Sequence, residues 1–218
     1  MSYIIMKNLE YKEYYRRKLP HFQPVEAVLF ITFRLVGSLP SHVIDKLEQE
    51  KNRMEKMLGK VDDPEIWKEL RYEQQKRWFA KYDNYLDNAK DGAKWLGDER
   101  IARLVFESLK YRDNKVYRLD AFSIMPNHVH LVAKPLVRQD GILPYSISKI
   151  LHSLKRYTAT EANKILGREG QFWQHESYDH VVRDDGEMDR IVQYVLNNPV
   201  KAGLVDSWKG WEWNYFRM

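Results

Sequence analysis

The fold of this chain is best predicted from the segment Tyr117-Arg-Leu-Asp-Ala-Phe-Ser-Ile-Met-Pro-Asn-His-Val-His-Leu-Val-Ala-Lys134. Its two halves, residues 117–124 and 129–134, are rich in the β-branched and aromatic side chains that favour strands. Met125-Pro126-Asn127 between them has the composition of a turn. The segment therefore predicts two strands that follow one another directly in a sheet.

Similar patterns on both sides of this segment predict the rest of the domain. A continuous apolar run from Ala27 to Leu35, bounded by Pro24 and Gly37, predicts a buried central strand. Helical spacing of apolar residues and alternation of side chains then predict four more elements: a helix over about 97–112, a helix over 143–166 that ends at Gly167, a strand over 172–182, and a last helix that starts after Asp184-Asp185 and stops at Asn198-Pro199.

A highly charged segment interrupts this series between residues 41 and 90. Its apolar residues recur at helical spacing, and the break between Gly59 and Pro64 predicts two helices. We expect a solvated pair that packs on the domain or on a partner, with contact to DNA as the alternative. Without this pair the order is β-α-β-β-α-β-α, which predicts the α+β class: a ferredoxin-like antiparallel sheet with covering helices. We expect one domain over residues 1–218 with a helical insertion at about 41–96.

Composition limits the possible functions. The 218 residues contain no cysteine, so disulfides, thiolate nucleophiles and cysteine-based zinc sites are excluded. The apolar runs are far shorter than the roughly 18–20 residues of a membrane span, and the N-terminus lacks a signal-peptide pattern, so we expect a cytoplasmic protein. The net charge of +5 has the sign expected of a protein that meets phosphate backbones, and the first forty residues carry six Lys or Arg against three Asp or Glu.

Two histidines in the second strand are candidate metal ligands. Side chains alternate along a strand, so His128 and His130 project from the same face. Two imidazoles on one rigid strand can bind a divalent metal, although surface or hydrogen-bonded histidines show the same spacing. In the last predicted helix, Tyr194 and Asn198 lie four residues apart and share a face, provided that the helix persists up to Pro199. The tyrosine could attack a phosphate while the amide completes the coordination shell of the metal.

These motifs resemble a known family. Met125-Pro-Asn-His-Val-His-Leu131 and Tyr194-Val-Leu-Asn-Asn-Pro-Val-Lys-Ala-Gly-Leu-Val205 are similar to the single-tyrosine transposases of the HUH superfamily, and most of all to their REP-associated branch. The segments Phe30–Pro40 and Gly170–Val182 also resemble that branch. The resemblance covers nearly the whole chain apart from about 41–96.

The resemblance implies a metal-dependent endonuclease and transposase for single-stranded DNA. It assigns His128 and His130 as metal ligands, Asn198 as a third ligand and Tyr194 as the nucleophile that forms a covalent 5′-phosphotyrosine link, so that strands can be rejoined at the same site. Mg²⁺ or Mn²⁺ is the expected ion, since a metal can neutralise charge on the scissile phosphate. Single-stranded or hairpin DNA, including REP-like palindromes, is the expected partner, and either a monomer or a homodimer agrees with the family.

Other residues compete for these roles or extend them. Tyr157 and Tyr178 are alternative nucleophiles, and His175 and His180 lie five apart on one strand, so at most one of them could join the site. Further candidate DNA contacts are Tyr15, Arg16, Arg17, Lys18, Lys155 and Arg156.

Two other functions are alternatives to the transposase. Hydrolases with a histidine triad would need a third histidine where this chain has Val132. A non-catalytic ferredoxin-like nucleic-acid-binding protein would use the sheet and the aromatic residues without a metal.

Overall fold

The computed structural model describes residues 15–16, 20–21, 26–89, 91–137 and 145–217. Its elements, in chain order, are β1 (Tyr15–Arg16), β2 (Pro20–His21), β3 (Leu29–Leu35), α1 (Ser41–Leu58), α2 (Pro64–Asp87), the 3₁₀ helix η1 (Trp95–Gly97), α3 (Glu99–Arg112), β4 (Tyr117–Ile124), β5 (His128–Pro135), α4 (Ile147–Leu166), β6 (Trp173–Val181), α5 (Asp185–Lys201), the 3₁₀ helix η2 (Trp208–Gly210) and β7 (Asn214–Phe216).

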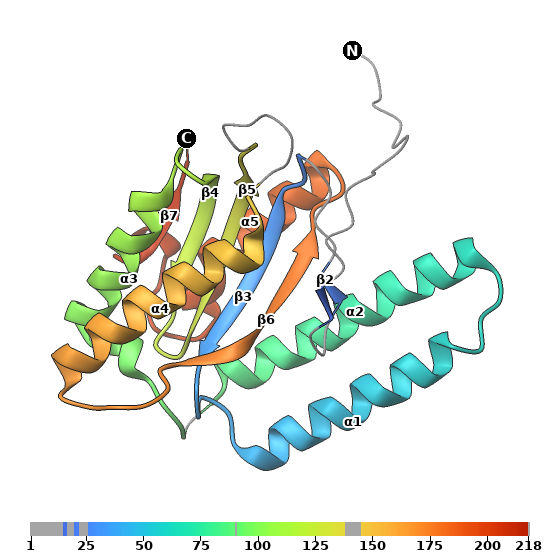
Figure 1. The fold of residues 1–218 in the computed structure, drawn as a ribbon, viewed down its shortest axis with the longest axis horizontal. Helices are drawn as coiled ribbons and strands as arrows, with labels where there is room; N and C mark the ends of the chain where they lie inside the picture. Colours follow the sequence, from blue (N-terminus) through green and yellow to red (C-terminus); the bar gives the residue numbers. More distant parts are fainter. Residues whose placement is uncertain (1–14, 17–19, 22–25, 90, 138–144, 218) are drawn as a thin grey trace.

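Five strands form one antiparallel sheet in the order β6-β3-β5-β4-β7 (Figure 1). The first four of these follow β3-α3-β4-β5-α4-β6 along the chain, so the last strand of the split arrangement pairs with the first. This is the ferredoxin-like topology that the order of elements predicted, and the α+β class with covering helices is confirmed.

The two faces of the sheet are covered by different helices. Leu29, Ile31 and Phe33 of β3 belong to the main core with α3 and α4. Phe30, between them on the strand, points to the other face and packs with Val195 and other residues of α5. In Figure 1, α3 and α4 accordingly lie in front of the sheet and α5 lies behind it. The α5 side is the face that carries the two histidines of β5.

The charged insertion forms a helical hairpin that extends beside β6 (Figure 1). Asp63 begins α2 by accepting hydrogen bonds from the backbone N–H groups of Glu65 (2.9 Å) and Ile66 (3.0 Å). Near the other end of α2, the ring of Phe79 lies edge-on to Phe30 with centroids 5.2 Å apart. The hairpin therefore packs on the domain, at the α5 side of the sheet.

Two expectations about the C-terminal region are corrected. The last helix does not stop at Asn198-Pro199 but continues to Lys201, because a proline removes only its own N–H donor while its carbonyl still accepts, here from Leu204 (2.9 Å). In addition, β7 pairs with β4 although no strand was predicted there. Arg217 holds this end of the chain through Asp113, at 2.6 and 2.7 Å. In the described part of the chain, no helix has the length and apolar character needed to cross a membrane.

Candidate active site

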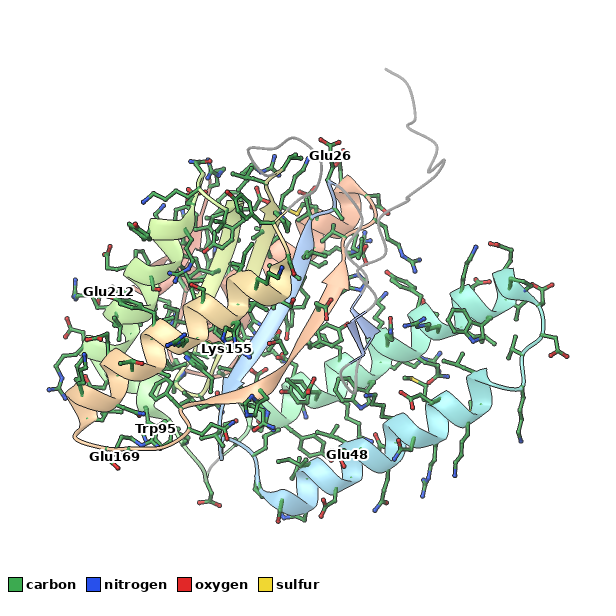
Figure 2. All side chains as sticks on the ribbon, viewed as in Figure 1. Glu26, Glu48, Trp95, Lys155, Glu169 and Glu212 are labelled. Atoms are coloured by element: carbon green, nitrogen blue, oxygen red, sulfur yellow. The ribbon has the colours of Figure 1, made fainter. Side chains whose placement is uncertain are left out.

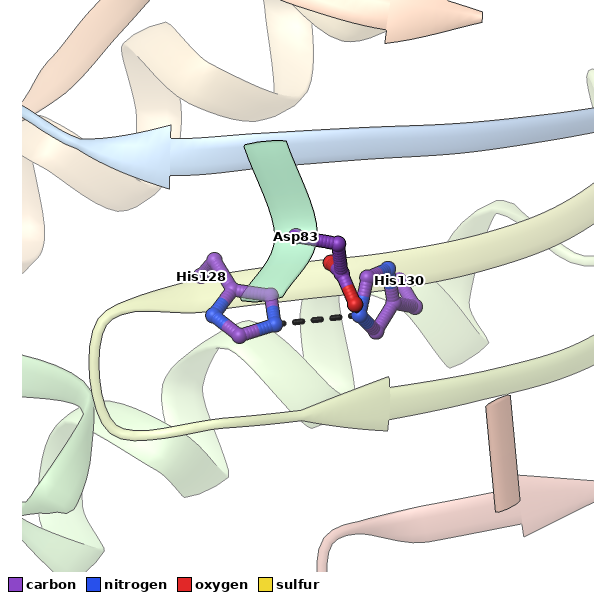
Figure 3. Close-up of side chains that lie close together, drawn as sticks. All are labelled: Asp83, His128 and His130. Atoms are coloured by element: carbon purple, nitrogen blue, oxygen red, sulfur yellow. Dashed lines mark hydrogen bonds and ion pairs between the residues drawn. The ribbon is translucent and has the colours of Figure 1, made fainter. Parts of the chain in front are cut away.

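His128 and His130 lie on β5 with their Nε2 atoms only 3.0 Å apart, and both are fully buried (Figure 3). A hydrogen bond of the other ring nitrogen, Nδ1, orients each ring. Nδ1 of His128 is 2.6 Å from Oδ1 of Asn127, and Nδ1 of His130 is 2.8 Å from the hydroxyl of Thr32 on β3. Such partners select the tautomer and direct the remaining nitrogen toward a cation.

The third member of this group comes from α2, far away in the sequence. Oδ1 of Asp83 lies 3.3 Å from Nε2 of His130, and Asp83 is fully buried (Figure 3). One ligand atom from each of Asp83, His128 and His130 lies within 4.8 Å of the others. In the described part of the chain, neither carboxylate oxygen of Asp83 accepts a hydrogen bond. An orphaned buried carboxylate beside two imidazole nitrogens is an arrangement that a cation would complete.

The protonation of these groups also suits a cation. Burial, together with the neighbouring His130, lowers the pKa of His128 to about 3, so its imidazole is neutral at physiological pH and its lone pair is available. Burial alone would raise the pKa of Asp83, but His130 and His128 hold the pKa of this carboxyl below its ordinary value. The group thus offers the neutral imidazole of His128 and the carboxylate of Asp83, on either side of His130 Nε2.

A divalent ion fits this donor set. Two atoms 3.0 Å apart can both lie about 2.1 Å from one ion, the usual metal–nitrogen distance. Mixed nitrogen and oxygen donors suit Mn²⁺ as well as Mg²⁺. Asp87, one helical turn beyond Asp83, adds a second carboxylate, with Oδ1 4.0 Å from Nε2 of His128 and Oδ2 paired with Lys201 at 2.7 Å.

Tyr194 and Asn198 lie beside the histidines on α5. The Tyr194 ring centroid is 5.6 Å from that of His130, and Nδ2 of Asn198 is 3.5 Å from the Tyr194 hydroxyl. Asn198 is fully buried, and its Oδ1 accepts no hydrogen bond from any described residue. The helix persists through this turn, so the tyrosine and the amide share a face as the spacing requires.

The competing residues lie in different surroundings. Tyr157 is half exposed on α4, which covers the opposite face of the sheet. Tyr178 is on the histidine side, but its ring is stacked on Phe79 at 4.1 Å, and burial raises its pKa above the ordinary value. His180 binds Glu187 of α5 at 3.0 Å instead of joining the Asp83–His128–His130 group.

Two of the expected DNA contacts, Lys155 and Arg156, lie on α4, away from this group. Lys155, which Figure 2 labels on α4, donates to the carbonyl of Gln174 (2.9 Å) and the hydroxyl of Ser177 (2.8 Å) of β6. Together with Arg156 and His175 it lines a cavity of about 320 Å³ between α4 and β6. Tyr15 and Arg16 form β1, whose side chains are outside the described residues, as are Arg17 and Lys18.

The sequence pattern did not identify Asp83, because the charged insertion predicts only a solvated pair of helices. Asp83 is one of many acidic residues there, yet it lies four residues after Phe79 and three before Leu86, on the apolar side of α2. An acid within an apolar stripe was the signal that could have identified it.

Residues 92–198 match the model of the family described as "Transposase IS200 like". The matched range includes His128, His130, Tyr194 and Asn198. Residues 92–198 of this chain are therefore similar to the IS200-like transposases. The match begins after α2, so Asp83 lies outside the part shared with the family model.

Two curated proteins and one solved structure are also similar to this chain. A "Putative REP-associated tyrosine transposase" of Haemophilus influenzae is 30% identical over 101 residues, which are 44% of this chain and 57% of the relative. An uncharacterized protein of the same organism is 29% identical over an alignment of 99 residues, with coverage of 38% of this chain and 54% of that protein. This chain thus spans a little over half the length of both relatives.

The solved structure is a REP-associated tyrosine transposase bound to a REP hairpin. It has a TM-score of 0.51 and 14% identity, and the alignment covers 91% of this chain and 81% of that one. This likeness supports the fold of the IS200-like domain and its surroundings. With the family match and the named relative, it confirms the resemblance to the REP-associated branch.

Proposed function

We propose that this IS200-like transposase cleaves and rejoins single-stranded DNA through a covalent 5′-phosphotyrosine formed by Tyr194. The observation that carries the proposal is the buried group of Asp83, His128 and His130 with Tyr194 and Asn198 next to it. A non-catalytic nucleic-acid-binding protein has no need of a buried carboxylate without a hydrogen-bond partner in the described chain.

His128, His130 and Asp83 would hold a divalent metal, with Asn198 Oδ1 as the amide donor that the family resemblance implies. When bound, such an ion supplies charge stabilisation for a scissile phosphate in a buried setting. The hydrogen bonds of His128 Nδ1 with Asn127 and of His130 Nδ1 with Thr32 keep both Nε2 atoms directed into the site.

Tyr194 is the proposed nucleophile. Its phenol oxygen attacks phosphorus, the bond between phosphorus and the 3′ oxygen breaks, and a bond from the tyrosine oxygen to the 5′ phosphate forms. The phenol proton passes to solvent and the 3′ oxygen takes up a proton as it leaves. The phosphodiester is replaced by another phosphate ester, so a 3′ hydroxyl can reverse the step without ATP.

Hairpin DNA is the proposed substrate class. The solved neighbour is bound to a REP hairpin, and the present chain shares its fold and its branch of the family. A hairpin flanked by single-stranded tails offers both a folded element for recognition and an unpaired strand for cleavage.

The test is covalent capture of a hairpin oligonucleotide whose two single-stranded tails carry randomised sequence. With Mn²⁺ or Mg²⁺ we expect a denaturation-resistant adduct that retains a 3′ label and releases a 5′ label. The adduct should be absent in EDTA and in Tyr194→Phe, and present in the control Tyr157→Phe. An adduct in Tyr194→Phe, or one formed in EDTA, would refute the mechanism, and DNA binding without any adduct would favour the non-catalytic binder.

A further inference from the structure

A second cavity lies between the helical hairpin and the edge strand β6. It has a volume of about 120 Å³, and its walls include Arg34, Trp78, Tyr82, Gln174, Glu176 and Tyr178. An adjoining cavity of about 320 Å³ shares Trp78 and Tyr178 with it and runs along α1 and α2. Pockets for drug-sized ligands begin at about 300 Å³, so the smaller cavity suits a single planar group.

Aromatic rings form one wall of this cavity. Trp78 and Tyr82 on α2 are stacked at 5.2 Å with an angle of 12° between their planes, and Tyr178 of β6 lies 6.2 Å from Trp78. The Trp78 indole is held by a hydrogen bond to the carbonyl of Leu47 on α1 (3.2 Å). Flat, fixed rings of this kind are surfaces on which unpaired bases stack.

Arg34 supplies a buried cation to the same cavity. Only 4% of its surface is exposed. In the described part of the chain, Arg34 donates hydrogen bonds to neutral oxygens, the Leu35 carbonyl (3.3 Å), the Ser38 hydroxyl (3.1 Å) and the Tyr82 hydroxyl, and no carboxylate there pairs with it. A buried guanidinium has donors to spare, and its five N–H groups can bind an acceptor edge in the plane of the guanidinium.

Glu176 supplies a hydrogen-bond acceptor to the cavity. Its Oε2 is buried and accepts no hydrogen bond from any described residue. Lys51 and Glu48 also line the cavity, so its charges are balanced. A balanced set of donors and acceptors next to stacked rings matches the edge of a nucleobase better than a phosphate, which would be repelled by the two carboxylates.

The cavity is adjacent to the proposed active site. Arg34 on β3 is the register partner of His128 on β5, and both lie on the same face of the sheet. Phe79, one residue after Trp78, packs against both Tyr178 (4.1 Å) and Tyr194 (6.4 Å). A nucleotide bound between the hairpin and β6 would therefore belong to the strand that meets Tyr194.

We infer that this cavity binds one unpaired guanine of the DNA strand, stacked on Trp78 and Tyr82. Guanine offers acceptors at O6 and N7 for Arg34 and N–H donors at N1 and N2 for Glu176. Adenine has a donor where Arg34 needs an acceptor, and hypoxanthine lacks the exocyclic amino group. Single-stranded DNA is the ligand only under the proposed function, so the test must separate base recognition from cleavage.

The test is fluorescence anisotropy in EDTA with labelled oligothymidylates of about twelve nucleotides that carry one central guanine, adenine or hypoxanthine. We expect the guanine oligonucleotide to bind on the order of tenfold more tightly than the adenine one. Glu176→Gln and Arg34→Lys should abolish this preference, whereas Glu169→Gln, an exposed residue labelled at the far end of α4 in Figure 2, should keep it. Thioguanine at the central position should photo-crosslink to the peptide that contains Trp78 and Tyr82.

Equal binding of all the bases by the wild-type chain would overturn the inference, and so would a guanine preference that survives Glu176→Gln. Glu176 is only half-buried on an edge strand, so this variant tests the cavity even if Arg34→Lys fails to fold. Because EDTA removes the metal, a guanine preference without a covalent adduct in the capture experiment would contradict cleavage and leave the base site standing. A covalent adduct without a guanine preference would contradict the base site and leave cleavage standing.

Discussion

The carboxylate of Asp83 on α2 lies 3.3 Å from Nε2 of His130 on β5, although the two residues belong to different parts of the chain. The contact forms because α2, the second helix of the charged hairpin, packs on the histidine face of the sheet through Phe79. The segment with the least family resemblance thus supplies the only acid in the histidine group of the described chain.

Replacing Asp83 tests whether this carboxylate binds the ion. We expect Asp83→Asn to weaken Mn²⁺ binding by at least about tenfold in isothermal titration calorimetry, since even outer-shell partners of a metal contribute that much. Asp45→Asn, on the exposed side of α1, should bind Mn²⁺ as the wild type does. Equal affinities of Asp83→Asn and the wild type would show that Asp83 is not a ligand.

The pair of Lys201 and Asp87 should stabilise the fold beside the site. The Asp87 side chain is 2% exposed, and its burial, together with Asp83, raises the pKa of this carboxyl while Lys201 opposes the rise. Lys201→Gln should cost about 1–2 kcal/mol of unfolding free energy in EDTA, less than a fully buried pair because Lys201 is half exposed. Asp87→Asn in the same chain should recover most of this loss in urea denaturation. Additive losses would mean that the two residues are not coupled.

A second polar cluster fixes α2 on the core. The Tyr72 hydroxyl donates to Oε1 of Glu187 at 2.5 Å, and the same oxygen is 3.0 Å from Nε2 of His180. Tyr72→Phe should reduce the unfolding free energy by about 1.5 kcal/mol, as expected for a hydrogen bond to a charged acceptor. Tyr111→Phe, on an exposed part of α3, is the matched control and should change little. The same Tyr72→Phe variant should weaken Mn²⁺ binding if docking of α2 positions Asp83.

The Tyr72 hydroxyl also predicts that the free energy of unfolding depends on pH in the alkaline range. Burial and the hydrogen bond to Glu187 raise the pKa of Tyr72 from 10.0 to about 12. A folded pKa above the unfolded one stabilises the fold fully below pH 10 and loses that contribution as the pH rises toward 12. The difference in unfolding free energy between the wild type and Tyr72→Phe should therefore shrink over this interval. A constant difference from neutral pH to pH 12 would contradict the assignment.

The parts predicted correctly from the sequence are those set by local pattern. Alternation along residues 117–134 placed both strands and put His128 and His130 on one face, and the acidic cap at Asp184 marked the start of α5, where it accepts from Glu187 N–H at 2.8 Å. The end of α5 was predicted too early because a proline removes only one backbone hydrogen bond from a helix. At Pro199 the packing of the helix outweighs this loss.

The parts that were missed depend on tertiary contacts. The strand β7 has three residues, too few for alternation to be recognised. Asp83 reaches the histidines only because α2 packs on the sheet. The local sequence pattern predicts this helix but does not predict where it packs. The roles of Tyr194 and Asn198 remain predictions, although the fold brings both side chains next to His130.

Because α2 packs on the histidine strand, the helical hairpin of α1 and α2 and the ion site are inherited together. A descendant that lost residues 41–88 would lose an acidic donor in the same event, and a chimaera with a relative that has no hairpin would be impaired first in ion capture. Under the proposed chemistry, gain or loss of this appendage would act as a control on nuclease strength within the lineage.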